Sequence, residues 1–316
     1  MNVPKITAAF LLVILQTWSF GQNKVNTYEG VTIGGIKQWI GAKSDDDSKP
    51  LLLFLHGGPG FSSRAYSKKF IKLLKKDFIV AQWDQRGTGI TAAWGSPDDP
   101  ITIELMHQDT EEVVNYLLKK FNKEKLYLVG FSWGGFLGFN FADKHPELLH
   151  AYIAVSAMIH NDRSESLTLA LIKEKAKTAN NKEALSEISG INVPFGSWEE
   201  LYFQRKWTAF FSQGNTSGKQ YPKSVFENWS QKWLSIFLEA SMVNYTETVP
   251  EIHCPIYFFQ SNKDLVANYR ITQQYFDSLK ANQKEIIWFD QSTHEIPGQE
   301  PEKFSQELIK LSQSLQ

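Results

Sequence analysis

A serine flanked by glycines is the first feature of this chain that could perform chemistry. The stretch 130–135 reads GFSWGG and follows the apolar run 126–129. A sharp turn from a strand into a helix would lift the Ser132 hydroxyl clear of a sheet, and it requires tiny residues two positions before and after the serine. The helix would aim its first backbone N–H groups at the same place. The pattern predicts a serine nucleophile; the alternative over so few residues is a glycine-rich turn that merely contains a serine.

Two further glycine-rich motifs lie upstream, each directly after a short apolar run. Residues 56–60 read HGGPG after the run 51–55, and residues 83–89 read WDQRGTG after the run 78–82. Together with GFSWGG, these motifs resemble those of the α/β-hydrolase-fold serine hydrolases of the prolyl aminopeptidase (proline iminopeptidase) type. The resemblance covers the chain from about residue 30 to its C-terminus. It implies a mostly parallel sheet with helices on both faces, an inserted helical cap and serine hydrolase chemistry.

A serine nucleophile needs a base to take its proton and an acid to orient that base. In this fold the chain order is serine, acid, histidine. His294 lies five residues beyond the last predicted strand and before the final helix, so we predict it as the base. Asp264 follows the predicted strand 255–260 and is the predicted acid. Asp290, four residues before the histidine, is the alternative acid.

The same chemistry needs two hydrogen-bond donors preset for an oxyanion. The backbone N–H of Trp133, directly after the serine, is one predicted donor of the oxyanion hole. Gly58, in the first glycine-rich loop, is the other, and the family resemblance also points to it. We interpret His56 and the 84–89 loop as structural supports, and Arg86 as an internal ion-pair partner.

Apolar strands that alternate with helical stretches must position these groups. The alternation predicts an α/β fold with a mostly parallel sheet covered on both faces. The predicted strands are residues 51–55, 78–83, 126–130, 151–155, 255–260 and 285–289, preceded by a hairpin over 31–42. The predicted helices are residues 65–76, a helix capped near Thr102, the helix after Ser132, and residues 269–279 and 301–315.

Residues 157–250 break this alternation, because they contain no convincing strand. Aromatic residues recur there at spacings of three and four, as in Trp229, Trp233 and Phe237, which predicts amphipathic helices. The resembling family carries its helical cap at this place. We expect most of the aromatics to form the core of the cap and a few to line the roof of an apolar pocket. The predicted domains are the first part of the core at 23–156, the cap at 157–250 and the second part of the core at 251–316.

The N-terminal segment has the pattern of an export signal. Lys5 precedes the apolar run 6–15, which is too short to span a bilayer, and the stretch 19–22 (SFGQ) offers a small-residue cleavage site. We predict a signal peptide over residues 1–22 and an exported mature chain, periplasmic or secreted, without stable membrane insertion. An uncleaved membrane anchor is the alternative. The chain has one cysteine, so no internal disulfide can form.

Composition and motifs argue against several other classes of protein. The 316 residues, 42% of them hydrophobic, can bury one large core plus an insertion. A net charge of −1 and the lack of a long basic tract argue against a nucleic-acid partner. The sequence shows no metal-ligand cluster, phosphate loop or dinucleotide fingerprint, so we predict no cofactor and no metal. Serine at the turn, rather than aspartate, argues against epoxide-hydrolase chemistry.

The substrate is less constrained than the chemistry. The resembling prolyl aminopeptidases hold the substrate's free amino group with cap glutamates, one of them in a stretch like A-R-I-E-N. Here the similar stretch, 240–244, reads ASMVN, with Val243 at the glutamate's place. We therefore expect ester or N-blocked substrates to be cleaved at rates comparable with free aminoacyl ones. The cap acids that could replace the glutamate, although a solvated helix face is the simpler role for them, are Glu199, Glu200, Glu227 and Glu239.

These features predict an exported serine hydrolase with a Ser-His-Asp triad and an acyl-enzyme mechanism. The first interpretation is a prolyl-aminopeptidase-like peptidase on short peptides. The second is a carboxylesterase, lactonase or amidase that uses the same triad on a neutral small substrate. The third is a binding protein on a hydrolase scaffold, and an intact triad argues against it. The sequence predicts no oligomeric state.

Overall fold

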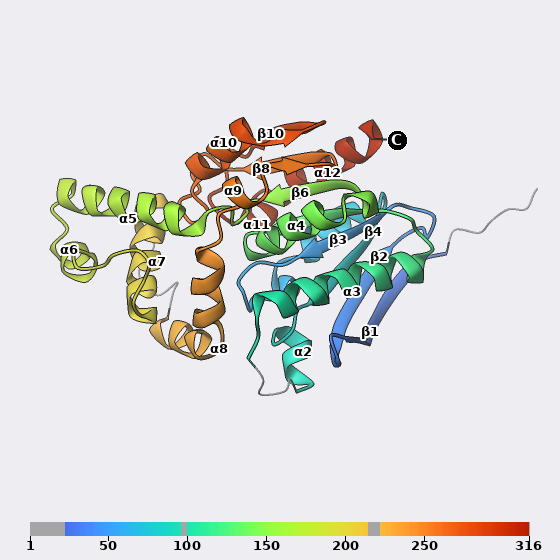
Figure 1. Cartoon of the computed structure of the whole chain (residues 1–316), viewed down its shortest axis with the longest axis horizontal. Helices are drawn as coiled ribbons and strands as arrows, with labels where there is room; N and C mark the ends of the chain where they lie inside the picture. Colours follow the sequence, from blue (N-terminus) through green and yellow to red (C-terminus); the bar gives the residue numbers. More distant parts are fainter. Residues whose placement is uncertain (1–22, 96–99, 214–221, 316) are drawn as a thin grey trace, which may run out of the picture.

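The computed structural model of the chain describes residues 23–95, 100–213 and 222–315. Eight strands form one sheet in the order β1-β2-β4-β3-β5-β6-β8-β10 (Figure 1). The pairings from β4 to β10 are parallel, whereas β2 is antiparallel to both β1 and β4. The strands are β1 (Val25–Ile33), β2 (Ile36–Ser44), β3 (Leu51–Leu55), β4 (Ile79–Asp84), β5 (Leu126–Phe131), β6 (Leu149–Val155), β8 (Ile256–Gln260) and β10 (Lys284–Trp288).

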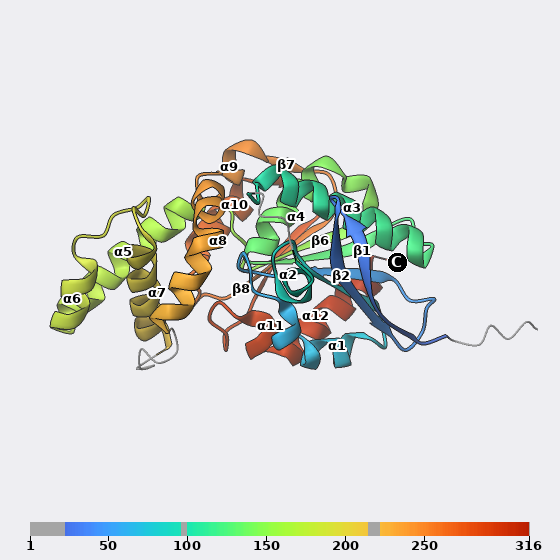
Figure 2. The same cartoon turned by 90° about the horizontal axis from the view of Figure 1, so that it is seen from below.

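The inner strands are buried on both faces of the sheet. Every residue of β3, β4 and β5 is buried, as is typical of parallel strands that have helices on both sides. Helices α1, α11 and α12 cover one face, and α3, α4 and α10 cover the other (Figure 2). The helices are α1 (Lys68–Leu74), α2 (Gly89–Ala93), α3 (Ile103–Phe121), α4 (Trp133–Lys144), α10 (Tyr269–Ser278), α11 (Ile296–Gln299) and α12 (Pro301–Ser314).

Helices alone fill the described part of the segment after β6. All but the last of them project from one end of the sheet (Figure 1), and a bridge between His160 and Asn244 joins the start and the end of the segment. The segment contains α5 (Asn161–Thr178), α6 (Lys182–Ile188), α7 (Trp198–Gln213), α8 (Lys223–Ser241) and α9 (Tyr245–Thr248). We call α5–α8 the cap. Trp207 is buried within it, whereas Trp233 is buried where it meets the first glycine-rich loop, so Trp207 belongs to the expected cap core.

Most element boundaries agree with the sequence within a few residues. The hairpin is longer than predicted, since β1 and β2 pair from Val25–Ser44 to Ile33–Ile36. Helix α3 begins at the predicted cap, where Thr102 Oγ1 accepts a hydrogen bond from the Leu105 N–H at 3.2 Å. A two-stranded sheet of β7 (Glu251–Ile252) and β9 (Lys280–Ala281) was not predicted, because two residues are too few to show a periodic pattern.

A buried ion pair fastens the second glycine-rich loop to helix α3. Arg86 Nε donates to Asp109 Oδ2 at 2.9 Å and Arg86 Nη2 donates to Asp109 Oδ1 at 2.8 Å. Gln38 Nε2 also donates to the Asp109 carboxylate, at 2.7 Å. The interpretation of Arg86 as an internal ion-pair partner is therefore confirmed. Cys254, between β7 and β8, is buried as a free thiol.

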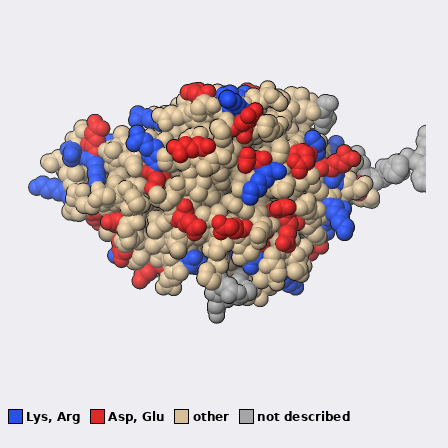
Figure 3. Space-filling model, viewed as in Figure 1, with Lys and Arg blue, Asp and Glu red and all other residues tan. Residues whose placement is uncertain are grey.

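The surface carries both signs of charge. Figure 3 shows basic and acidic side chains interspersed over the face seen in Figure 1. In the three described ranges, no helix combines the length and the hydropathy needed to cross a membrane. The predicted signal peptide, residues 1–22, lies outside the described residues.

Candidate active site

Ser132 stands at the sharp turn between β5 and α4. Its φ of 53° and ψ of −113° lie outside the regions that residues with a side chain prefer. A Cβ on Gly130 would lie 2.5 Å from the carbonyl oxygen of Gly134, and a Cβ on Gly134 would overlap the backbone oxygen of Leu55. The two glycines are thus required where β5, α4 and β3 approach each other, as the motif predicts.

The structure brings the three predicted catalytic residues together. Ser132 Oγ lies 3.0 Å from His294 Nε2, and His294 Nδ1 lies 3.0 Å from Asp264 Oδ2. A carboxylate can only accept, so Nδ1–H donates to Asp264 and Nε2 is left to accept the serine proton. Asp264 is fully buried. Its other oxygen, Oδ1, accepts from the N–H groups of Val266 at 2.9 Å and Ala267 at 3.0 Å.

The alternative acid lies away from the imidazole. Asp290 is exposed, and its Oδ1 lies 3.5 Å from Asn262 Nδ2. Its backbone oxygen accepts from Lys263 Nζ at 2.5 Å. These contacts make Asp290 a loop carboxylate that faces solvent.

Opposing effects act on the pKa of His294. Burial lowers the pKa of the imidazole, but the negative charge of Asp264 and its hydrogen bond raise it, and Glu295 adds to the increase. Arg205 acts in the other direction. The balance raises the pKa of His294 above its ordinary value. The imidazole is therefore a stronger base than a free histidine once its proton is lost.

The two predicted oxyanion donors border the serine. A Cβ on Gly57 would lie 3.3 Å from Ser132 Cβ, so the backbone of this loop runs close beside Ser132. Gly58 continues the same loop, and Trp133 opens α4, where the first N–H groups have no acceptor within the helix. Within the described part of the chain, neither the Gly58 nor the Trp133 N–H has a protein acceptor. Both amides are available to a ligand oxygen.

His56 supports this loop instead of facing the site. It is fully buried, and its Nε2 accepts from the Gln85 N–H at 3.2 Å. Gln85 Nε2 donates in return to the His56 carbonyl at 3.1 Å. Burial lowers the pKa of His56 to about 4, against smaller opposing effects of Gly57 and Asp84. The residue stays neutral and joins the two glycine-rich loops, as interpreted from the sequence.

A cavity of about 380 Å³ opens above Ser132 and His294. The cap forms its roof, and apolar side chains dominate the lining. Among them are Met158, Leu201, Phe226, Trp229, Phe237 and Leu265. Some cap aromatics therefore line an apolar pocket, as expected from the sequence. Val243 and the four cap acids considered above are not part of this lining.

Two charged residues at the cavity were not predicted from the sequence. Glu295, next to the histidine in the chain, is reached by solvent through the cavity. The protein around it still removes part of its hydration and raises the pKa of its carboxyl. Arg205 of α7 is the second charged residue, and it pairs with Glu165 of α5. Adjacency to His294 could have pointed to Glu295, whereas no sequence signal joins Glu165 to Arg205.

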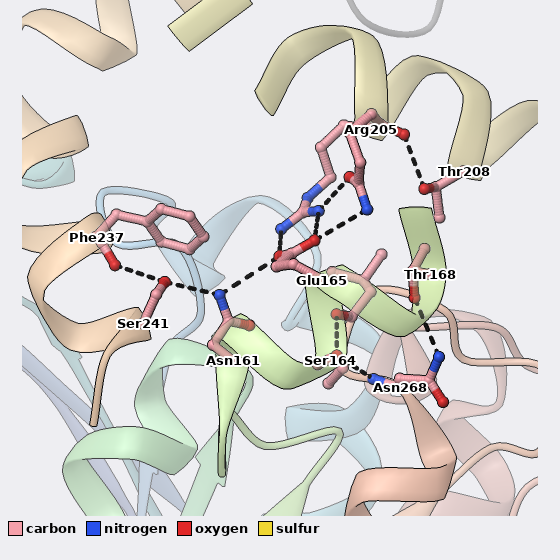
Figure 4. A network of polar contacts seen from close by, with 12 residues as sticks. Asn161, Ser164, Glu165, Thr168, Arg205, Thr208, Phe237, Ser241 and Asn268 are labelled. Atoms are coloured by element: carbon pink, nitrogen blue, oxygen red, sulfur yellow. Dashed lines mark hydrogen bonds and ion pairs between the residues drawn. The ribbon is translucent and has the colours of Figure 1, made fainter. Parts of the chain in front are cut away.

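The Glu165 carboxylate is the centre of a buried polar network in the cap (Figure 4). Glu165 Oε2 accepts from Arg205 Nη1 at 2.6 Å and from Gln204 Nε2 at 2.9 Å. Its Oε1 accepts from Arg205 Nη2 and, at 3.4 Å, from Asn161 Nδ2. Asn161 Nδ2 also donates to Ser241 Oγ of α8 at 2.7 Å. The network joins α5, α7 and α8 above the cavity.

The fold and the relatives of the chain define an α/β-hydrolase. The family described as "Serine aminopeptidase, S33" matches residues 46–302, and the chain belongs to this family. A probable aminopeptidase, YbaC, of Bacillus subtilis (strain 168) is 30% identical over 301 residues, which are 89% of this chain and 94% of that protein. A proline iminopeptidase of Clostridium botulinum is 34% identical over 115 residues, 35% of this chain and 36% of that protein.

The solved structures extend the likeness in fold to nearly the whole chain. The proline iminopeptidase of Mycobacterium smegmatis superimposes with a TM-score of 0.66 at 18% identity, covering 92% of this chain and 99% of that one. At this identity the comparison establishes the fold. The predictions of an α/β-hydrolase fold, of a resemblance to the prolyl aminopeptidases and of a hydrolase are thereby confirmed.

Proposed function

We propose that this protein is an exported serine hydrolase of aminopeptidase type, acting through an acyl-enzyme. The observation that carries the proposal is the hydrogen-bonded series Asp264–His294–Ser132 at the floor of the cavity. In the proposed reaction Ser132 is the nucleophile, His294 the general base and acid, and Asp264 the residue that orients the imidazole.

The geometry supports a two-step reaction. The Ser132 oxygen attacks the substrate carbonyl carbon while His294 Nε2 takes the hydroxyl proton. The carbonyl oxygen becomes an oxyanion that the N–H groups of Gly58 and Trp133 stabilise. His294 then gives the proton to the leaving nitrogen or oxygen as that bond breaks. Water, deprotonated by the same histidine, releases the acyl group and restores the serine.

The cavity favours an apolar acyl group that carries a positive charge. Its lining is mainly apolar, and the Glu295 carboxylate faces it beside His294. Glu295 has no ion-pair partner among the residues that the structure describes. A substrate ammonium would supply the missing countercharge. We therefore propose short peptides with a free amino end and an apolar first residue as substrates, with Glu295 in place of a cap glutamate.

A neutral ester or amide is the second candidate substrate. It is favoured by the apolar roof, since none of the cap acids considered belongs to the lining of the cavity. The two candidates differ in the ratio of kcat/KM for free and N-acetylated prolyl p-nitroanilide. Peptidase specificity through Glu295 predicts a ratio well above 10 that falls in Glu295→Gln and persists in the matched control Glu199→Gln. A wild-type ratio near 1, with good p-nitrophenyl ester turnover, would instead establish the neutral substrate.

The proposal that the protein is exported rests on the N-terminal sequence alone. Lys5, the apolar run 6–15 and the small residues that follow support a cleaved signal peptide. Mass spectrometry of the native protein is expected to give an N-terminus near Gln22 or Asn23. An intact Met1 in a cytoplasmic fraction would contradict export.

A further inference from the structure

The cap helix α5 is bound directly to the turn that carries the proposed acid (Figure 4). Thr168 Oγ1 donates to the Leu265 carbonyl at 2.7 Å, and Ser164 Oγ donates to the Val266 carbonyl at 3.1 Å. Each hydroxyl also accepts from Asn268. The backbone N–H of Asn268 donates to Ser164 Oγ at 2.8 Å, and Asn268 Nδ2 donates to Thr168 Oγ1 at 3.1 Å. Each hydroxyl thus donates one hydrogen bond to the turn and accepts one from it.

The peptide units held by α5 are the ones that hold the acid. The carbonyl of Leu265 and the N–H of Val266 belong to one planar peptide unit, and the carbonyl of Val266 and the N–H of Ala267 belong to the next. Each unit therefore receives a hydroxyl of α5 on one side and donates its N–H to Asp264 Oδ1 on the other. Because the units are planar, the orientation of each carbonyl fixes the direction of its N–H.

The residues that join α5 to the acid turn are buried, so losing one of their hydrogen bonds costs free energy. Thr168 and Asp264 have no exposed surface, and Ser164 is only 3% exposed. The bond of Thr168 to the Leu265 carbonyl is buried, so water cannot readily replace a lost Thr168 hydroxyl and this carbonyl would stay unsatisfied. A hydrogen bond to a carbonyl also polarises the N–H of the same peptide unit, which strengthens its bond to the carboxylate.

The same helix face reaches the roof of the cavity. Asn161, Ser164, Glu165 and Thr168 are spaced by three and four residues and lie on one side of α5. Asn161 and Glu165 belong to the network with Arg205, and both Asn161 and Arg205 line the cavity. Helix α5 therefore contacts both the cavity and the two peptide units that hold Asp264.

We propose that Ser164 and Thr168 are positioning residues for the reaction: they orient the two peptide units that hold Asp264, and through Asp264 they set the orientation and basicity of His294. The proposal rests on the proposed triad. It makes the cap helix part of the catalytic support and not only a cover over the cavity.

The test uses variants that remove one hydroxyl each. Thr168→Val keeps the shape of the side chain, and Ser164→Ala removes one atom. Each is expected to lower kcat about tenfold, the effect of roughly one lost hydrogen bond, while KM changes less than about threefold. Thr168→Ser restores a hydroxyl and is expected to recover most of the activity. Ser166→Ala is the matched control, because Ser166 Oγ donates within α5 to the Asp162 carbonyl.

The pH profile separates positioning from mere stability. A less well held Asp264 stabilises the imidazolium less, so the acid limb of kcat/KM is expected to move to lower pH in Thr168→Val and Ser164→Ala. The other charged groups that act on His294, Glu295 and Arg205, are unchanged in both variants. Any p-nitrophenyl ester or aminoacyl substrate that the wild type cleaves serves for this measurement.

The measurements distinguish a positioning role of the two hydroxyls from a purely structural one. A lower melting temperature with wild-type kcat and an unmoved acid limb would make the two hydroxyls structural only and overturn the proposal. If Thr168→Val does not fold, Ser164→Ala and Thr168→Ser decide the question in the same way. Two other results would instead contradict the proposed triad. These are retained turnover in Ser132→Ala and a wild-type protein that a fluorophosphonate does not label.

Discussion

The fully buried carboxylate of Asp264 accepts a hydrogen bond from His294 Nδ1. Asp264→Asn is expected to lower kcat by about 10³–10⁴, because the amide can present its NH₂ to Nδ1 and favour the wrong tautomer. Steady-state kinetics on any good substrate measures the effect, with circular dichroism to verify folding.

Asp290→Asn is the control for this change, since it also removes one carboxylate charge near the C-terminal end of a strand. Asp290 is exposed and contacts Asn262, so its variant is expected to keep nearly the full turnover. A large loss of turnover in Asp290→Asn, together with an active Asp264→Asn, would show that the acid is Asp290 and not Asp264.

The charge of Glu295 acts on the imidazole of His294. His294 must be neutral to act as the proposed base, so activity is expected to fall as the pH decreases through the pKa of this residue. Glu295 raises that pKa, hence Glu295→Gln is expected to move the acid limb of kcat/KM for a neutral ester to lower pH. A limb that stays in place would mean that the carboxylate is too well solvated to act on the imidazole.

Individual residues were predictable where a local motif fixed their geometry. Ser132 follows from tiny neighbours in a tight turn, and His294 and Asp264 follow from the chain order of the fold. Arg205 and Glu165 were not predictable, because they stand 40 residues apart on different helices. Their pairing depends on how the cap helices pack, and the sequence carries no local sign of that.

At the scale of elements, the cap also contacts the loop that carries Gly58. Trp229 Nε1 of α8 donates to the Pro59 carbonyl at 2.8 Å. A Cβ on Gly60 would overlap the Trp233 indole of the same helix. Helix α5 holds the acid turn and α8 holds the loop of the proposed oxyanion hole, so the cap supports both sides of the serine.

Gly60→Ala tests the contact between α8 and this loop. The added methyl group must push α8 or the loop away, so kcat/KM is expected to fall about tenfold or more, and the positive φ of 89° adds backbone strain. Gly95→Ala is the matched control, since Gly95 has a φ of 88° but a methyl group there would meet no described atom within 4 Å. Equal losses in the two variants would assign the effect to strain alone.

The strands and long helices were predictable because burial imposes an apolar pattern on their sequences. Short apolar runs predicted the inner strands, and aromatic residues spaced by three and four predicted the cap helices. The positions of α5 and α8 against the core were not predictable, because they depend on single hydroxyl and indole contacts between distant segments. The periodicity of a sequence indicates which face of a helix is buried, but it does not indicate which segment packs against that face.

At the scale of the molecule, the Arg86–Asp109 pair joins the second glycine-rich loop, the first hairpin and α3. Its side chains are 7% and 0% exposed. Asp109→Ala is expected to lower the free energy of unfolding by about 3–5 kcal/mol, because it leaves a buried guanidinium without its countercharge. Urea denaturation monitored by tryptophan fluorescence measures the change.

A surface ion pair provides the comparison for this measurement. Glu307 and Lys310 lie 2.7 Å apart on α12, and their side chains are 19% and 66% exposed. Glu307→Ala is expected to change the free energy of unfolding by less than about 1 kcal/mol. Similar values for the two variants would show that the buried pair contributes no more than an exposed one.

The burial of Cys254 has a practical consequence for studying the cap. It is the one cysteine of the chain, it is 3% exposed, and burial raises the pKa of its thiol to about 12. The thiolate is the form that reacts with maleimides, so the native thiol stays inert in the folded protein at neutral pH. Fluorophores or spin labels can therefore be attached at cysteines introduced on α6 and α12 without removing a native one. Distances between the two labels would then follow the cap in solution, with and without substrate.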